Sequence, residues 1–183
     1  AGYCYQIEAI EIKLVEKGSR APGATERAYV QKRYIKYASH VADYGWLSDV
    51  YDGSISGTIG KCKQMEAISI SLENQPYGGN IEYRTHSADI GWQEFRSNGT
   101  VAGTVGRNKQ MEAIEIKLTG EMEKEYDIYY RVHIADYGWL DWAKNGASAG
   151  SEGMSKRIEA IEIRIVQKGG SEPGNTVRPF IKK

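Results

Sequence analysis

The stretch QMEAIEIKL, residues 110–118, decides the fold because the chain repeats it with its pattern intact. Isoleucine and leucine alternate with glutamate and lysine in its second half, which is typical of a strand with one buried face. Near-copies stand at residues 6–14 (QIEAIEIKL), 64–72 (QMEAISISL) and 157–165 (RIEAIEIRI). A strand that recurs at such distances predicts a β protein built from similar units, each too small to bury its own core.

Two further sequence motifs, called phrases below, recur together with this strand. HVADYGW, HSADIGW and HIADYGW begin at His40, His86 and His133, and they contain every histidine of the chain. DGSISGTIG, NGTVAGTVG and NGASAGSEG follow at residues 52–60, 98–106 and 145–153. Each unit therefore holds the histidine phrase, a glycine-rich turn region and the repeated strand. The three units cover about residues 34–72, 80–118 and 126–166.

The fold class that follows is all-β with pseudo-threefold symmetry. Tyrosine-rich, β-branched segments such as IYYRVHI favour strands, and the DG and NG pairs favour tight turns, so each unit offers three or four short strands. Two architectures fit: a β-prism with one sheet per unit, which we favour, and a β-trefoil. No segment indicates a convincing helix, because GEMEKEYD at residues 120–127 is short and lacks an apolar stripe.

The ends of the chain resemble each other, since residues 1–32 match residues 152–183 in sequence. We therefore interpret residues 1–14 as the terminal strand of a preceding or shared repeat, and residues 15–166 as the three-repeat domain. Residues 167–183 are then a linker or the start of a next triplet.

Composition excludes several classes of function. The net charge of the 183 residues is zero, which argues against a nucleic-acid partner, and no apolar run approaches the length of a transmembrane segment. Cys4 and Cys62 are too few for a disulfide framework; they occupy equivalent repeat positions, so free thiols are expected unless the terminal strand docks beside the first unit.

The recurring aromatic and acidic residues have a structural and a functional interpretation. For Trp46, Trp92 and Trp139 the structural one, a core position under each sheet, is favoured over an aromatic platform for a sugar ring. The aspartates of the same phrase, which are Asp43, Asp89 and Asp136, are expected to accept backbone hydrogen bonds in a turn, with ligand hydroxyl binding as the functional alternative.

The histidines and the strand glutamates are assigned structural roles. His40, His86 and His133 have no zinc-type spacing, so their rings are expected to bond backbone or carboxylate. The strand glutamates would face inward by strict alternation, so either a bulge turns them outward or they bond a neighbour such as histidine. These glutamates are Glu8, Glu66, Glu112 and Glu159.

Together these motifs resemble the ChW family, the clostridial hydrophobic repeat with a recurring tryptophan. The resemblance covers about residues 34–166 and the strand at 6–14. It implies a secreted or cell-surface, non-enzymatic module of Gram-positive anaerobes. It does not supply a binding site residue by residue. The chain is expected to depart from equal repeats where Tyr51 and Phe95 stand in place of Trp142, and where AGSEG replaces AGTVG.

The predicted function is attachment, with no catalytic residues, cofactor or metal. The favoured partner is a glycan or cell-wall polysaccharide. The alternatives are an adhesin that captures a host secreted protein such as immunoglobulin or mucin, and a structural spacer. Candidate binding residues are the aromatic and acidic side chains Tyr44, Tyr51, Phe95, Tyr137, Trp142, Asp43, Asp89 and Asp136.

Overall fold

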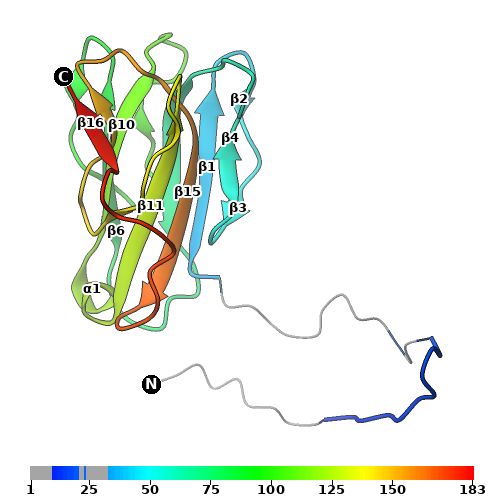
Figure 1. Cartoon of the computed structure of the whole chain (residues 1–183). Coiled ribbons are helices and arrows are strands. Elements are labelled where there is room, and N and C mark those ends of the chain that lie inside the picture. Colours follow the sequence, from blue (N-terminus) through cyan, green and yellow to red (C-terminus); the bar gives the residue numbers. More distant parts are fainter. Residues whose placement is uncertain (1–9, 21–22, 24–32) are drawn as a thin grey trace. The chain divides into compact units, whose positions relative to one another are not determined.

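The computed structural model describes residues 10–20, 23 and 33–183 (Figure 1). The chain divides into two parts, an N-terminal part of residues 1–32 and a domain of residues 33–183. In the N-terminal part, residues 10–20 form no strand and expose Ile10, Ile12 and Leu14. The terminal strand that we expected over residues 1–14 is thus absent from residues 10–14. Its remainder, residues 1–9, lies outside the described residues.

The domain of residues 33–183 consists of three β-sheets around one core. The first sheet contains β1 (Ile35–Val41), β2 (Gly45–Trp46), β3 (Val50–Tyr51), β5 (Met65–Leu72) and β9 (Ala102–Gly103). The second contains β6 (Ile81–Ser87), β7 (Gly91–Trp92), β8 (Arg96–Ser97), β10 (Met111–Leu118), β14 (Ala149–Glu152) and β16 (Phe180–Lys182). The third contains β11 (Tyr126–Ile134), β12 (Gly138–Trp139), β13 (Ala143–Lys144), β15 (Ile158–Gln167) and β4 (Ile55–Gly57). Three separate sheets, none of them closed, form a prism, so the all-β threefold prediction is confirmed and the trefoil alternative is wrong.

The long antiparallel strands carry the alternation that the sequence predicts. They run along one axis of the prism (Figure 1). Their inward residues are isoleucines, valines, methionines and tyrosines. In each sheet one long strand has a register shift that leaves a glutamate unmatched, as between Met111 and Ala113 at Glu112. The expected bulge is therefore present, and it lets the apolar residues on both sides face the core.

A short strand of each unit completes the sheet of a neighbouring unit. β4 of the first unit pairs with β15, β9 of the second pairs with β5, and β14 of the third pairs with β10, all antiparallel. This cyclic exchange closes the ring of three units. Gly150 shows why a glycine is needed there: its φ is 119°, and a Cβ would lie 2.2 Å from the backbone oxygen of Glu112.

Three buried tyrosines add hydrogen bonds between the units. The Tyr130 hydroxyl accepts a hydrogen bond from the Ile116 backbone N–H at 2.9 Å and donates one to the Ala147 carbonyl. The hydroxyls of Tyr83 and Tyr37 likewise accept from Ile70 and Ile163, at 3.0 and 3.1 Å. Burial raises the pKa of the Tyr130 and Tyr37 phenols far above the usual range, so both remain protonated donors.

One short helix, α1 (Gly120–Glu125), contradicts the expectation that no segment is helical. It lies at one end of the prism between β10 and β11 (Figure 1), and its single buried residue is Met122. One turn of helix needs no apolar stripe when one side chain reaches the core. Packing of Met122 therefore decides the conformation here, rather than helix propensity.

The C-terminal residues belong to the prism, which corrects the interpretation of residues 167–183 as a linker or a next triplet. The segment crosses the third sheet, where the Trp142 backbone N–H donates to the Asn175 carbonyl at 2.8 Å. β16 then pairs in parallel with β14 in the second sheet (Figure 1).

Candidate functional site

The three repeat tryptophans lie on the outer surface, so the prediction that they form the core is wrong. Trp46 exposes 42% of its surface, and Trp92 and Trp139 are half-buried. Each stands in a two-residue strand directly opposite a histidine, as in the pair His40 and Trp46. Inward positions are already filled by isoleucine and tyrosine of the long strands, so the indoles remain outside.

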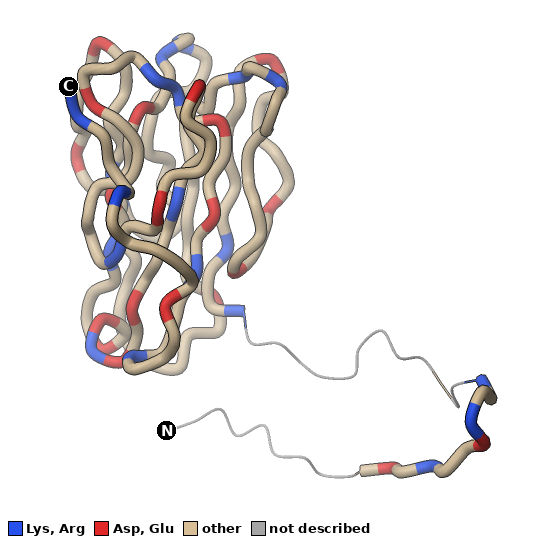
Figure 2. The backbone as a smooth tube through the Cα atoms, in the orientation of Figure 1, with Lys and Arg blue, Asp and Glu red and all other residues tan. Residues whose placement is uncertain are grey.

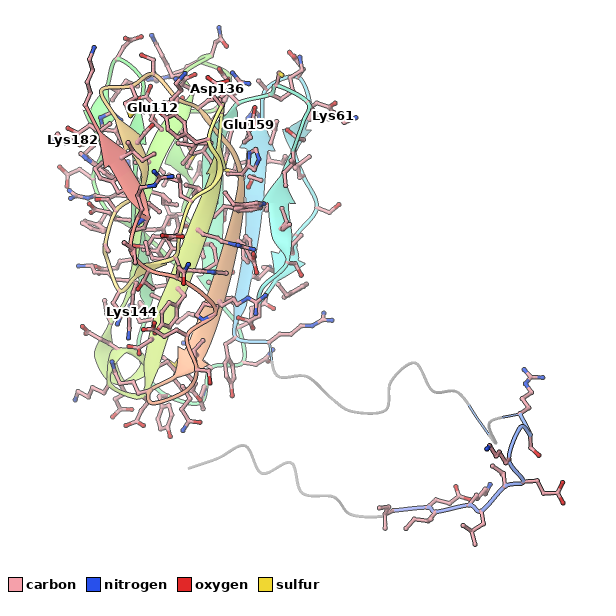
Figure 3. All side chains as sticks on the ribbon, in the orientation of Figure 1. Lys61, Glu112, Asp136, Lys144, Glu159 and Lys182 are labelled. Carbon is pink, nitrogen blue, oxygen red and sulfur yellow. The ribbon has the colours of Figure 1, made fainter. Side chains whose placement is uncertain are left out.

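A histidine and a glutamate support each indole from one side. The His40 ring meets Trp46 edge to face with centroids 5.5 Å apart, and His40 Nδ1 lies 3.3 Å from a Glu66 carboxylate oxygen. The other two units repeat this arrangement with nearly the same distances, through His86 and Glu112 and through His133 and Glu159. Glu112 and Glu159 lie toward the same end of the prism in Figure 3. The arrangement fixes the ring orientation of each indole. What lies on the other face of the indole differs between the units.

The phrase aspartates lie in the turns, but their exposed carboxylates pair with lysines instead of accepting the backbone hydrogen bonds that were expected. Asp43, Asp89 and Asp136 all have positive φ, between 62° and 70°. Their side chains pair with lysines; Lys156 Nζ, for example, lies 2.5 Å from Asp136 Oδ2. That hydrogen bond lowers the pKa of Asp136, and Lys109 does the same for Asp89. The residues beside them, Tyr44 and Tyr137, are exposed at the turn tips and contribute to no recess that the structure shows.

An arginine covers the indole face in the third unit. The Arg131 guanidinium lies 4.7 Å from the Trp139 ring centroid and 4.8 Å from that of Trp142, and it pairs with Glu162 at 2.7 Å. Trp142 is only 4% exposed, because the C-terminal segment at Asn175 also packs on it. Trp142, a predicted binding residue, is therefore not available to a ligand.

The second unit has the same cover. Arg84 lies 5.0 Å from the Trp92 centroid and 4.8 Å from that of Phe95, and its Nε is 2.6 Å from Glu115. A guanidinium between two rings and a carboxylate fills the outer face of the sheet. Phe95, although partly exposed, thus serves mainly to hold Arg84.

Among the residues that the structure describes, the first unit lacks this cover. The strand register places Ala38 opposite Ser69, where the other units pair Arg84 with Glu115 and Arg131 with Glu162. The result is an open recess of about 320 Å³. We call it the Trp46 recess. Its lining consists of Ala38, Trp46, Leu47, Asp49, Ser69 and Val101.

The same register corrects the predicted equivalence of Tyr51 with Trp142. Tyr51 is opposite Lys36, just as Lys144 is opposite Tyr129, so Tyr51 corresponds to Lys144. The residue in the place of Trp142 is Asp49. Tyr51 instead packs under the Arg33 guanidinium, which lies 4.9 Å from its ring centroid.

The Trp46 recess combines an aromatic wall with one carboxylate. Asp49 lies 3.6 Å from Lys36 Nζ, and the Ser69 hydroxyl donates to the Gly99 carbonyl at 2.9 Å. Among the described residues no group of three histidine, cysteine or acidic side chains is placed to hold a metal ion. Cys62 is a free, exposed thiol, whereas Cys4 lies outside the described residues, and with it the predicted choice between thiol and disulfide.

The charges of the domain show no single-sign face in the view of Figure 2, where basic and acidic residues are interspersed along the strands. No helix in the described part of the chain is long and apolar enough to cross a membrane. The recess therefore offers the most specific chemistry among the positions described. The sequence contained its signal, because Ala38 and Ser69 break an arginine and glutamate pair that the other two units share.

Comparison with known proteins supports the repeat assignment. A family model described as clostridial hydrophobic W matches residues 40–74, 86–120 and 133–167. Each match begins at the phrase histidine and ends after the repeated strand, so it spans the indole and the strand on which it rests. No curated protein and no solved structure matches the chain.

Proposed function

The chain belongs to the clostridial hydrophobic W family, and from this premise we propose that it is a non-catalytic module that binds glycan in the Trp46 recess. Repeats of this family are often found in surface-associated proteins. The proposal therefore places the module outside the cell, secreted or on the cell surface, where polysaccharide is the available partner.

The observation that carries the proposal is the face of Trp46, which no arginine in the described part of the chain covers. Its counterparts Trp92 and Trp139 lie under arginines of the chain itself, whereas Trp46 borders an open recess of about 320 Å³. The C–H face of a sugar ring packs on an indole as other apolar groups do. The volume is near the lower limit of small-molecule sites, about 300 Å³, and suits one or two sugar rings.

The recess favours binding over hydrolysis. Glycoside hydrolysis ordinarily needs two carboxylates at a controlled separation on either side of the bond. Asp49 is the single carboxylate in the lining. This supports a module that holds a polysaccharide without cleaving it.

Calorimetry with a panel of neutral and charged oligosaccharides tests the proposal. We expect Trp46→Ala to weaken binding at least about tenfold, or about 1.4 kcal/mol. The matched control is Trp92→Ala, which removes a covered indole and is expected to bind as the parent does. A second variant, Ala38→Arg with Ser69→Glu, copies the cover of the other units, so it should close the recess and abolish binding while the fold remains intact.

Other outcomes would favour the alternative functions. Capture of a secreted host protein that survives Trp46→Ala, without glycan binding, would favour an adhesin. If the chain binds neither the oligosaccharides in calorimetry nor a secreted host protein in the capture assay, a structural spacer is favoured.

A further inference from the structure

We propose that the Trp46 recess selects a cationic glycan, one whose sugar rings carry free primary amines, through the carboxylate of Asp49 and the face of Trp46. This inference rests on the proposed function and names the substrate class of the same site. Three independent features of the recess support it: the chemistry of the equivalent space in the other units, the charge of its lining, and its size.

The other units show which chemistry this space accepts. In the third unit the equivalent volume holds the Arg131 guanidinium, 4.7 Å from the Trp139 centroid. In the second unit it holds Arg84, 5.0 Å from the Trp92 centroid. A cation over an indole gains about 0.5–2 kcal/mol, more as water is excluded. The first unit keeps the indole in the same place and leaves the cation to be supplied by a ligand.

The charge of the recess has changed in the same direction. Four positions differ between units: an arginine has become Ala38, a glutamate Ser69, a basic residue Ser71 and an aromatic ring Asp49. These four positions carry a net charge of +1 in the second and third units and −1 in the first, while Lys36, which stands where the other units have Glu82 and Tyr129, adds one positive charge beside Asp49. A site that loses two cations and gains a carboxylate attracts a positive ligand.

The carboxylate of Asp49 is available to a ligand. Its ion pair in the described part of the chain is with Lys36 at 3.6 Å, beyond a direct hydrogen bond. Lys36 lies closer to Glu73, at 3.0 Å. Its pKa is raised first by the hydrogen bond to Glu73 and less by the charge of Asp49, so its ammonium group is held mainly at Glu73. Asp49 therefore borders the recess with unused hydrogen-bonding capacity.

The size of the recess favours a sugar over a single side chain of a protein. Three side chains that fill this place in the other units are replaced by smaller ones, and the space left is about 320 Å³. One arginine or lysine would leave much of it filled by water. A pyranose ring on Trp46 with its ammonium group at Asp49 uses both the apolar wall and the carboxylate.

Calorimetry with two matched trisaccharides tests the inference. One is the β-1,4-linked glucosamine trimer, which carries free amines, and the other is its fully N-acetylated form, which is neutral. We expect the intact chain to bind the amine form at least about tenfold more tightly, a difference of about 1.4 kcal/mol. The preference should shrink as salt rises, because the Asp49 contact is partly exposed.

Asp49→Asn isolates the charge, since the amide is isosteric and the native side chain is about half exposed. It should bring the affinities for the two trisaccharides to within about twofold of each other, while Trp46→Ala should weaken the binding of both. The matched control is Glu94→Gln, which removes an exposed carboxylate beside the covered Trp92 and should leave the preference unchanged. Thermal melts of each variant verify the fold.

Equal binding of the two trisaccharides to the intact chain overturns the inference and leaves the proposed function standing, as does Trp46-dependent binding of other neutral glycans alone. Absence of binding to any glycan overturns both. Binding of an arginine-rich peptide to the recess without any glycan also overturns the inference, because it assigns the cationic site to a protein partner.

Discussion

Removal of the Tyr130 hydroxyl, in the variant Tyr130→Phe, measures how strongly hydrogen bonds between units stabilise the prism. The phenol ring is fully buried and stays in place in the variant, so packing is nearly unchanged. What is lost is one bond from the Ile116 N–H and one to the Ala147 carbonyl. The perturbation is thus confined to two hydrogen bonds, of which the one from Ile116 joins the second and third units and the one to Ala147 lies within the third unit.

The two lost bonds have different costs. Ile116 is fully buried, so its N–H is left without a partner, at about 1–3 kcal/mol. Ala147 is exposed and its carbonyl can turn to water, so that bond contributes only about 0.5–1.5 kcal/mol. The free energy of unfolding should fall by roughly 2–4 kcal/mol. For a domain of this size the melting temperature should fall by about 2–4 °C for each kcal/mol.

Urea denaturation followed by tryptophan fluorescence gives the measurement, with the change in midpoint interpreted at constant slope. Tyr44→Phe is the matched control, because its hydroxyl lies on an exposed turn tip and its removal should cost less than about 0.5 kcal/mol. The reasoning is refuted if Tyr130→Phe is no more destabilising than this control. In that case water or a backbone shift satisfies the Ile116 N–H, and the hydrogen bonds of the three buried tyrosines do not hold the units together.

Further outcomes follow from the strand exchange, the acidic groups and the surface indoles. Gly150→Ala should destabilise by roughly 3 kcal/mol or more in urea denaturation, since its Cβ meets a backbone oxygen at positive φ, whereas Gly106→Ala, with open space at its Cβ, should cost about 1 kcal/mol. Burial by itself would raise the pKa of Asp127, but hydrogen bonds from Lys168, Asn145 and Lys144 outweigh it and hold the pKa at about 2. Because that value lies below the unfolded pKa of about 3.9, the stability that Asp127 supplies is complete above that pH and is lost as the pH falls toward 2. The gap in unfolding free energy between parent and Asp127→Asn should narrow over this range, and a constant gap would contradict the assignment. Acrylamide should lose most of its quenching effect in Trp46→Phe and little in Trp139→Phe, because Trp46 is the more exposed indole.

The long strands were predictable because they are long. Eight residues of alternating character fix which face is buried, and the glutamate that breaks the alternation correctly indicated a bulge. The number of units and the all-β class followed from the repeats, whereas the repeats alone left both the prism and the trefoil open. The exchanged strands were not predictable, because β4, β9 and β14 have only two to four residues and too little alternation to indicate a partner.

The error over the tryptophans has a specific physical cause. A large apolar ring is expected in the core, but the GW strand has two residues and carries no periodicity of its own. Its pairing with His40 decides its face, and the histidine is on the outer side of the long strand. The binding-site prediction failed similarly at Trp142, because the segment that covers it lies more than thirty residues further along the chain.

The Trp46 recess was within reach of the sequence but lay in an unexpected place. Attention to residues that all units share leads to the tryptophan, histidine and glutamate, which build the support. The recess comes from Ala38 and Ser69, which differ from their counterparts. In a repeat protein, a position at which one copy loses a matched pair is a better indicator of a binding site than a position at which all copies agree.

The cyclic strand exchange has a consequence for how such chains change in length. With the first and last units joined through β4 and β15, deletion of one unit leaves a donor strand without its acceptor and a long strand with a bare edge. Bare edges pair with other chains and cause aggregation. Unequal recombination between these near-identical repeats would therefore yield folded products only when it adds or removes a complete triplet, and the copy number of a lineage should grow in steps of three.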